Sequence, residues 1–141
     1  MGGIETESLL ELDLPAVPES CARARRDVGA AVAGRGLDAG AVALAVSEAV
    51  TNAVVHAYRD RVPEDGDGCV RIRVSADATG IWIRVTDEGL GMSARDDSPG
   101  LGVGLSLVAT VTDQLLILQG DTGTRVHMRF EFDTSASAAV S

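Results

Sequence analysis

The sequence predicts one α/β domain, a two-layer sandwich with helices packed on one face of a mixed, mainly antiparallel sheet. Short segments in which apolar and polar residues alternate are joined by turns, which is typical of antiparallel hairpins. Longer segments with helical patterning lie among them. With 141 residues, 45% of them apolar, the chain is long enough to bury one core.

The first half is expected to contain one strand and two helices. Leucines at positions 10, 12 and 14 alternate with acidic residues, which indicates a half-buried strand. Pro15 and Pro18 end that strand, and residues 19–33 are predicted to form the first helix. Glycines mark the turn that follows. Asp38 is the predicted N-cap of a second helix, which runs to about Tyr58.

The second half is expected to contain two hairpins and a third helix. Residues 70–74 and 81–85 alternate around a turn at 76–80, and 114–119 and 124–132 form the last two strands. The helix is predicted at 103–112. The ordered domain should cover 1–133, with a disordered tail at 134–141. The sheet face away from the helices should be solvated, and it carries Arg71, Arg73, Arg84, Arg125, His127 and Arg129.

Composition excludes several classes of function. The formal net charge is −9, which disfavours nucleic acid as a partner. All 12 basic residues are arginine, so a Walker-type phosphate loop, which requires lysine, is excluded. No segment is typical of a signal peptide or a membrane span, so we expect a cytoplasmic protein without a membrane partner. Cys21 and Cys69 are expected to be reduced thiols.

A polar stripe stands out on the second helix. Glu48, Asn52 and His56 follow one another at intervals of four residues, which places them on one side of a helix that is otherwise mostly apolar. A carboxylate on a largely buried helix normally has a task, because an unpaired buried charge is costly. Taken singly, the three residues could equally be a solvated helix face and a hydrogen-bonded histidine.

Strand parity places two further polar groups on the same side of the sheet. Asp87 shares the parity of the apolar residues before it, and Thr124 shares that of the apolar residues after it, so both should face the helices. Glycine-rich segments at 87–92 and 99–105 lie nearby in sequence, and the second precedes a helix whose N-terminal amides favour phosphate. Each glycine segment alone could be only a turn.

Together these motifs resemble those of the histidine-kinase-type ATPase superfamily. Residues 48–58 resemble its N box, 87–91 its G1 box, 100–105 its G2 box, and Gly123 with Thr124 its last motif. The resemblance spans about residues 44–132 and implies the Bergerat-type ATP-binding fold. The short length and the N-terminal strand and helix are similar to the small anti-sigma-factor serine kinases, the RsbW-like group.

The resemblance implies a role for each motif residue, with ATP and Mg²⁺ as cofactors. Asn52 would be the Mg²⁺ ligand, Glu48 the general base, and Asp87 the acceptor for the adenine amino group. His56 would lie near the phosphates, and Arg95 would contact one. The remaining nucleotide-binding residues would be Gly89, Gly91, Met92, Gly102, Val103, Gly104, Leu105 and Thr124.

The implied activity is phosphorylation of a serine on a STAS-type antagonist, with partner switching that regulates a sigma factor. A homodimer is also implied. The chain departs from the pattern in two places: Val55 stands where many relatives have lysine, and only residues 93–99 separate Met92 from Gly100. This short lid favours the alternative, an ATP-binding interaction module with little or no kinase activity. A small metabolic ATPase is a weaker alternative, because no second substrate site is evident.

Overall fold

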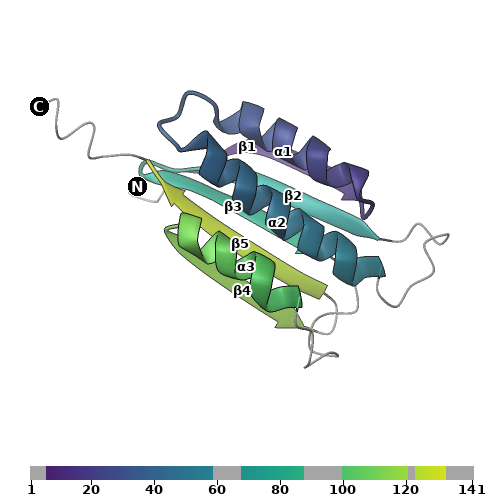
Figure 1. The fold of residues 1–141 in the computed structure, drawn as a ribbon. Helices are drawn as coiled ribbons and strands as arrows, with labels where there is room; N and C mark the ends of the chain where they lie inside the picture. Colours follow the sequence, from purple (N-terminus) through teal and green to yellow (C-terminus); the bar gives the residue numbers. More distant parts are fainter. Residues whose placement is uncertain (1–5, 59–67, 88–99, 121–122, 133–141) are drawn as a thin grey trace, which may run out of the picture.

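The computed structural model describes residues 6–58, 68–87, 100–120 and 123–132; the side chains of 56–58 and 100–104 fall outside that description. Within these ranges the chain forms a sheet covered on one face by helices (Figure 1). The elements in order are β1 (Glu7–Pro15), α1 (Glu19–Val32), α2 (Ala39–Tyr58), β2 (Cys69–Ala76), β3 (Gly80–Asp87), α3 (Gly100–Val111), β4 (Gln114–Gly120) and β5 (Gly123–Glu131).

The described strands form one sheet in the order β1-β2-β3-β5-β4. Every neighbouring pair is antiparallel, so this sheet is antiparallel throughout rather than mainly so. β4 is parallel to β3 but is not its neighbour, because β5 lies between them. The chain passes from β3 through α3 to the edge strand β4 and then returns as β5 to the position between β3 and β4. The two-layer α/β sandwich predicted from the sequence is confirmed.

The helices begin where local chemistry favours them. Asp38 caps α2 as predicted, since its Oδ1 accepts the N–H of Ala41 at 3.1 Å. α3 begins at Gly100, three residues before the predicted start, so the second glycine segment forms its first turn. The first four N–H groups of a helix have no intrahelical partner, and glycine leaves them open to a ligand. The predicted glycine loop is therefore a helix N-terminus.

The core lies between the helices and the sheet and is built almost entirely from aliphatic side chains. α2 is the central helix, in contact with α1 on one side and α3 on the other (Figure 1). Its buried side includes Ala45, Ala49 and Ala53, each at most 3% exposed. The largest fully buried side chains of the described residues are Ile72, Ile81, Ile83, Met128, Val28, Val42, Val46, Val50, Val70, Val74, Val85 and Val108.

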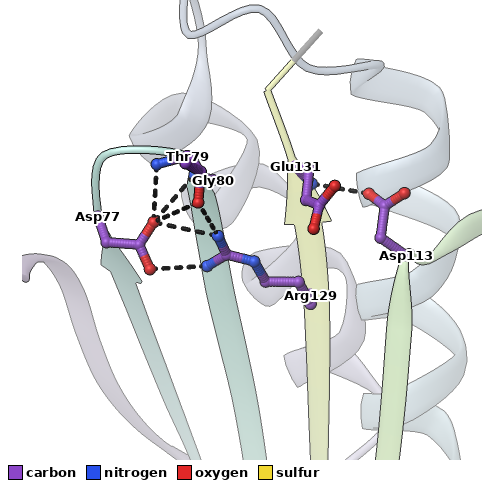
Figure 2. A network of polar contacts seen from close by, with 6 residues as sticks. All are labelled: Asp77, Thr79, Gly80, Asp113, Arg129 and Glu131. Atoms are coloured by element: carbon purple, nitrogen blue, oxygen red, sulfur yellow. Dashed lines mark hydrogen bonds and ion pairs between the residues drawn. The ribbon is translucent and has the colours of Figure 1, made fainter. Parts of the chain in front are cut away.

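The sheet face without helices carries most of the predicted arginines, but Arg129 was wrongly expected to be solvated. It is only 6% exposed and makes a two-pronged ion pair with Asp77, with N–O distances of 2.8 and 3.1 Å (Figure 2). It also donates to Thr79 Oγ1 at 2.6 Å and lies over the Trp82 ring, 5.6 Å from its centroid. Alternation predicts which face of the sheet the Arg129 side chain occupies. It does not predict its partner Asp77, which is 52 positions away in the sequence.

Asp77 is the centre of this network at the β2–β3 turn. Its Oδ1 also accepts the backbone N–H groups of Thr79 and Gly80 at 2.9 and 3.0 Å (Figure 2). The hydrogen bond from Arg129, followed by that from the Thr79 amide, holds the pKa of Asp77 well below its usual range. The network fixes the β2–β3 turn to the end of β5.

Candidate functional site at the Asp87 end of the sheet

α2 carries two of the predicted site residues on its half-buried flank. Glu48 and Asn52 are one turn apart and both are half-buried, next to the fully buried alanines of the same helix. They are therefore less enclosed than the apolar sequence around them suggested. A half-buried position suits groups that act on a ligand, because their polar atoms stay accessible while the helix holds them in place.

α1 helps to hold α2 in place through side-chain contacts that were not predicted from the sequence. Cys21 Sγ lies 3.3 Å from Thr51 Oγ1, and Arg25 donates to Ser47 Oγ at 3.4 Å. Ser47 and Thr51 each precede a predicted site residue by one position. The only signal in the sequence for this supporting role of Ser47 and Thr51 is their position on α2, next to the polar stripe. Cys21 and Cys69 are both free, as predicted.

β3 and β5 place Asp87 and Thr124 directly across from each other. The two residues are register partners in the antiparallel pairing of these strands. They are 6% and 3% exposed, so both face the helix-covered side, as their parity predicted. Side chains directly opposite on one face have Cβ atoms about 4.5–5.5 Å apart. A buried carboxylate and a buried hydroxyl thus lie side by side at the end of β3.

The start of α3 lies at this same end of the sheet. Only Thr112 and Asp113 separate α3 from β4, and Gln114 is paired with Arg129 at the far end of β5. The 12-residue helix therefore ends near Arg129 and begins near Thr124. α3 also packs against α2 (Figure 1). The N-terminal amides of α3, which have no partner within the helix, and the helix dipole make this end of the sheet favourable for an anion.

Five of the predicted positions belong to elements that pack against one another, and others lie outside the described residues. Glu48, Asn52, Asp87 and Thr124 lie on α2, β3 and β5, which are in contact, and Leu105 is buried in α3 with 4% exposure. Gly102, Val103 and Gly104 lie in the first turns of α3. The His56 side chain and Gly89, Gly91, Met92 and Arg95 lie outside the described residues.

A hollow of about 520 Å³ lies at the opposite end of the sheet and is unsuited to a nucleotide. Its polar lining is acidic, and carboxylates repel phosphates. Two of those carboxylates already accept backbone N–H groups: Asp38 from Ala41 and Asp113 from Glu131. The residues that line it are Gly36, Leu37, Asp38, Ala41, Val111, Asp113, Phe130 and Glu131.

Comparison with known families gives a consistent match over most of the chain. Residues 14–130 match the family model of the histidine kinase-like ATPase domain. The serine-protein kinase RsbW of Bacillus pumilus is 31% identical, over 88% of this chain and 86% of that protein. An anti-sigma F factor of Clostridium botulinum is 33% identical, over 65% of this chain and 70% of that protein.

Solved structures show the same fold. The histidine kinase domain of the blue-light activated histidine kinase EL346 from Erythrobacter litoralis aligns with a TM-score of 0.59 at 26% identity. The alignment covers 88% of this chain and 64% of that one, so this chain spans less than two thirds of it. The RsbU and RsbW domains of a Mycobacterium tuberculosis protein align with a TM-score of 0.61 at 22% identity, over 86% of this chain and 31% of theirs.

No helix in the described ranges is both long and apolar enough to cross a bilayer. The ordered motifs, the antiparallel sheet with its helical layer, the family match and the curated relatives all agree. The chain therefore belongs to the histidine kinase-like ATPase domain family, in its group of anti-sigma factors and RsbW-type serine kinases.

Proposed function

We propose that this chain is a Mg²⁺-ATP-dependent protein kinase that phosphorylates a serine of a STAS-type antagonist and regulates a sigma factor by partner switching. The observation that carries the proposal is the buried pair of Asp87 and Thr124 at one end of the sheet. Glu48 and Asn52 on α2 and the N-terminus of α3 belong to the same end. Two relatives, a kinase named RsbW and an anti-sigma F factor, support the protein class.

The adenine would bind against the Asp87 and Thr124 pair. A carboxylate accepts a hydrogen bond from the exocyclic amino group of adenine, whereas the carbonyl at that position of guanine would meet it with repulsion. Burial of Asp87 strengthens this discrimination, because a hydrogen bond to a charged group contributes more where water is excluded. Thr124 would add a hydroxyl contact. Gly89, Gly91 and Met92 complete this proposed part of the site.

The phosphates would lie between α2 and the first turn of α3. Asn52 offers an amide oxygen, a hard ligand of the kind that Mg²⁺ accepts alongside water and phosphate oxygens. When bound, Mg²⁺ would neutralise charge on the phosphates. The amides of Gly102, Val103, Gly104 and Leu105, with Arg95 and His56, would contact them.

Glu48 would act as the general base. It would take the proton of the substrate serine while the serine oxygen bonds to the γ-phosphorus of ATP and the bond to the β-phosphate oxygen breaks, releasing ADP. Such a base contributes about 10²–10⁴ in rate. Its half-buried position one turn before Asn52 leaves the carboxylate accessible, which supports this role.

A second function, an ATP-binding interaction module without appreciable kinase activity, is favoured by the helix just after Asn52. Val55 occupies the position where many relatives have lysine, and it is 53% exposed. The site thus has an apolar group where a cation would stabilise transferred charge. In either function we propose a cytoplasmic homodimer whose partner is a protein.

Transfer of labelled phosphate tests the proposal. The protein is incubated with labelled ATP and candidate STAS-type antagonists, and wild type is compared with Glu48→Gln, Asn52→Ala and a control, Ser47→Ala on the same helix. We expect serine labelling that is lost in the first two variants and kept in the control. ATP affinity should fall mainly in Asn52→Ala. Normal ATP binding without labelling would support the module instead, and absence of adenine nucleotide binding would reject both.

A further inference from the structure

The two edges of the sheet differ in how they are protected against pairing with another strand. β1, at one edge, has acidic side chains, ends in Pro15, and has a register shift between Ser8 and Leu10. Charges, proline and bulges are the usual means by which proteins block edge-to-edge association. β4, at the other edge, has the sequence Gln-Leu-Leu-Ile-Leu-Gln-Gly, with neither charge nor proline. Among the described strands, the β1 edge has these protective features and the β4 edge has none of them.

β4 also exposes apolar side chains on the open face of the sheet. Leu116 is 49% exposed and Leu118 is 41% exposed, and they are two of the four large hydrophobic residues that are exposed in the described part of the chain. They are register partners of His127 and Arg125 on β5, which places all four side chains on the face without helices. An edge strand that no other described strand pairs on its outer side, and that exposes leucines, is suited to strand addition.

The strand beside β4 supplies a positive charge that has no counter-ion among the described residues. Arg71 and Arg73 share Asp13, and Arg129 has Asp77. Arg125, in contrast, has no carboxylate within 4.0 Å among the described residues, and Arg84 likewise has none. The pKa of His127, between them, is lowered by burial and then by the charges of Arg84 and Arg125. The face next to β4 is therefore cationic, although the whole chain is acidic.

We propose that the edge of β4 binds an extended, acidic segment of a partner protein as a sixth strand of the sheet. Backbone groups of β4 would pair with the segment, whose acidic side chains would lie on the open face. Their methylene groups would cover Leu116 and Leu118, and a carboxylate would meet Arg125. Strands lie about 4.8 Å apart, so the added strand would be about 10 Å from β5, within reach of an arginine and a glutamate that extend toward each other. This site lies on a different surface from the nucleotide pocket and goes beyond the proposed kinase function.

A second copy of the chain fits this edge less well. Two copies of β4 could align their leucines, but β4 contains no carboxylate, so Arg125 of both copies would stay unpaired. An acidic strand would pair with the backbone groups of β4, cover the two leucines and supply a carboxylate for Arg125. The partner class is therefore a protein with an exposed segment in which acidic and β-branched residues alternate.

A labelled peptide tests the proposal with the folded chain of residues 1–141. The probe is a fluorescein-labelled eight-residue peptide of alternating glutamate and valine, and its anisotropy reports binding. We expect saturable binding that weakens at least tenfold in Leu116→Lys and in Arg125→Glu. Two matched controls make the same changes at exposed positions of the helices: Leu107→Lys on α3 and Arg26→Glu on α1. Both should bind the peptide as the wild type does. Asn52→Ala should also bind normally, which separates this site from the nucleotide site.

The same assay contains the results that would overturn the proposal. These are no binding to the wild type, equal binding by Leu116→Lys, or equal binding of a lysine-valine peptide. Tighter binding of single-stranded oligothymidine than of the peptide would also reject it. Light scattering measures the oligomeric state and tests whether a second copy of the chain binds this edge. A wild-type dimer that becomes monomeric in Leu116→Lys would assign the β4 edge to a second copy and reject the proposal. Circular dichroism of each variant confirms that it is folded.

Discussion

The two ends of β3 carry aspartates with opposite tasks. Asp77, just before the strand, is joined to Arg129, Thr79 and Gly80 by hydrogen bonds and fixes a turn. Asp87, the last residue of the strand, lies on the other face, opposite Thr124 and beneath the helices, where we propose the adenine binds. The strand thus separates a structural carboxylate from one that we propose binds a ligand. The eight residues of this extended strand place the two carboxylates at opposite ends of the sheet.

The largest expected effect is on the Asp77 end. Arg129→Met should lower the free energy of unfolding by about 3 kcal/mol or more, because it leaves a mostly buried carboxylate without its cation. Urea denaturation at neutral pH measures this. ATP affinity, measured by calorimetry under folding conditions, should stay within about twofold of wild type. The double variant Asp77→Asn with Arg129→Met should recover part of the stability. A large loss of ATP affinity in the single variant would show that the two ends are coupled.

The complementary change is at the Asp87 end. Asp87→Asn should weaken ATP binding by about tenfold to a hundredfold, the effect of losing a hydrogen bond to a charged acceptor. Asp77→Asn is the matched control, since it makes the same chemical change at the other end of the strand. It should leave ATP affinity unchanged and lower stability instead. Equal ATP affinity in both variants would remove Asp87 from the proposed site.

The two threonines provide a smaller version of the same test. Thr79→Val removes the hydroxyl that accepts from Arg129 and should cost about 1 kcal/mol of stability. Thr124→Val should instead weaken ATP binding by about fivefold, the same free energy expressed at the ligand. Thermal unfolding and nucleotide titration of both variants distinguish the two outcomes. A stability loss in Thr124→Val as large as that in Thr79→Val would indicate a structural role for both.

The last expected effect is a dependence on acid pH. The pKa of Asp77 is lowered in the folded state from its ordinary value of 3.8, chiefly by the hydrogen bond from Arg129. Its contribution to stability is therefore complete above pH 3.8 and is lost as the pH falls toward the folded-state pKa. The difference in unfolding free energy between wild type and Asp77→Asn should be constant from pH 5 to 7 and shrink below about pH 4. A constant difference down to pH 2 would contradict this assignment.

Local pattern was enough to predict most elements, because their signals lie within a few residues. Alternation gave the strands and their faces, including the inward positions of Asp87 and Thr124, and Asp38 was identified as a cap from its type and place. The burial of Arg129 was not predictable in this way, since its partner comes from a distant turn. The start of α3 was missed because glycine signals a loop unless tertiary packing holds it in a helix.

The candidate site was harder to predict than the fold, and for a different reason. The motif residues could be placed on α2, β3, α3 and β5, but no local rule says that these elements end at the same place. That follows from the position of β5 between β3 and β4, which brings Thr124 opposite Asp87. The roles of His56, Gly89, Gly91, Met92 and Arg95 stay predictions, since the structure does not describe them.

The alanines on the buried side of α2 have a consequence for how such a pocket can evolve. Ala45, Ala49 and Ala53 fill their places with single methyl groups, so the helix axis can lie close to the sheet. A leucine at Ala49 would need space that a close-packed core does not have, and α2 would have to move outward. Glu48 and Asn52 would move with it. The depth of the proposed pocket, and with it the reach of both groups toward a phosphate bound there, would thus be set by three alanine side chains that lie in the core.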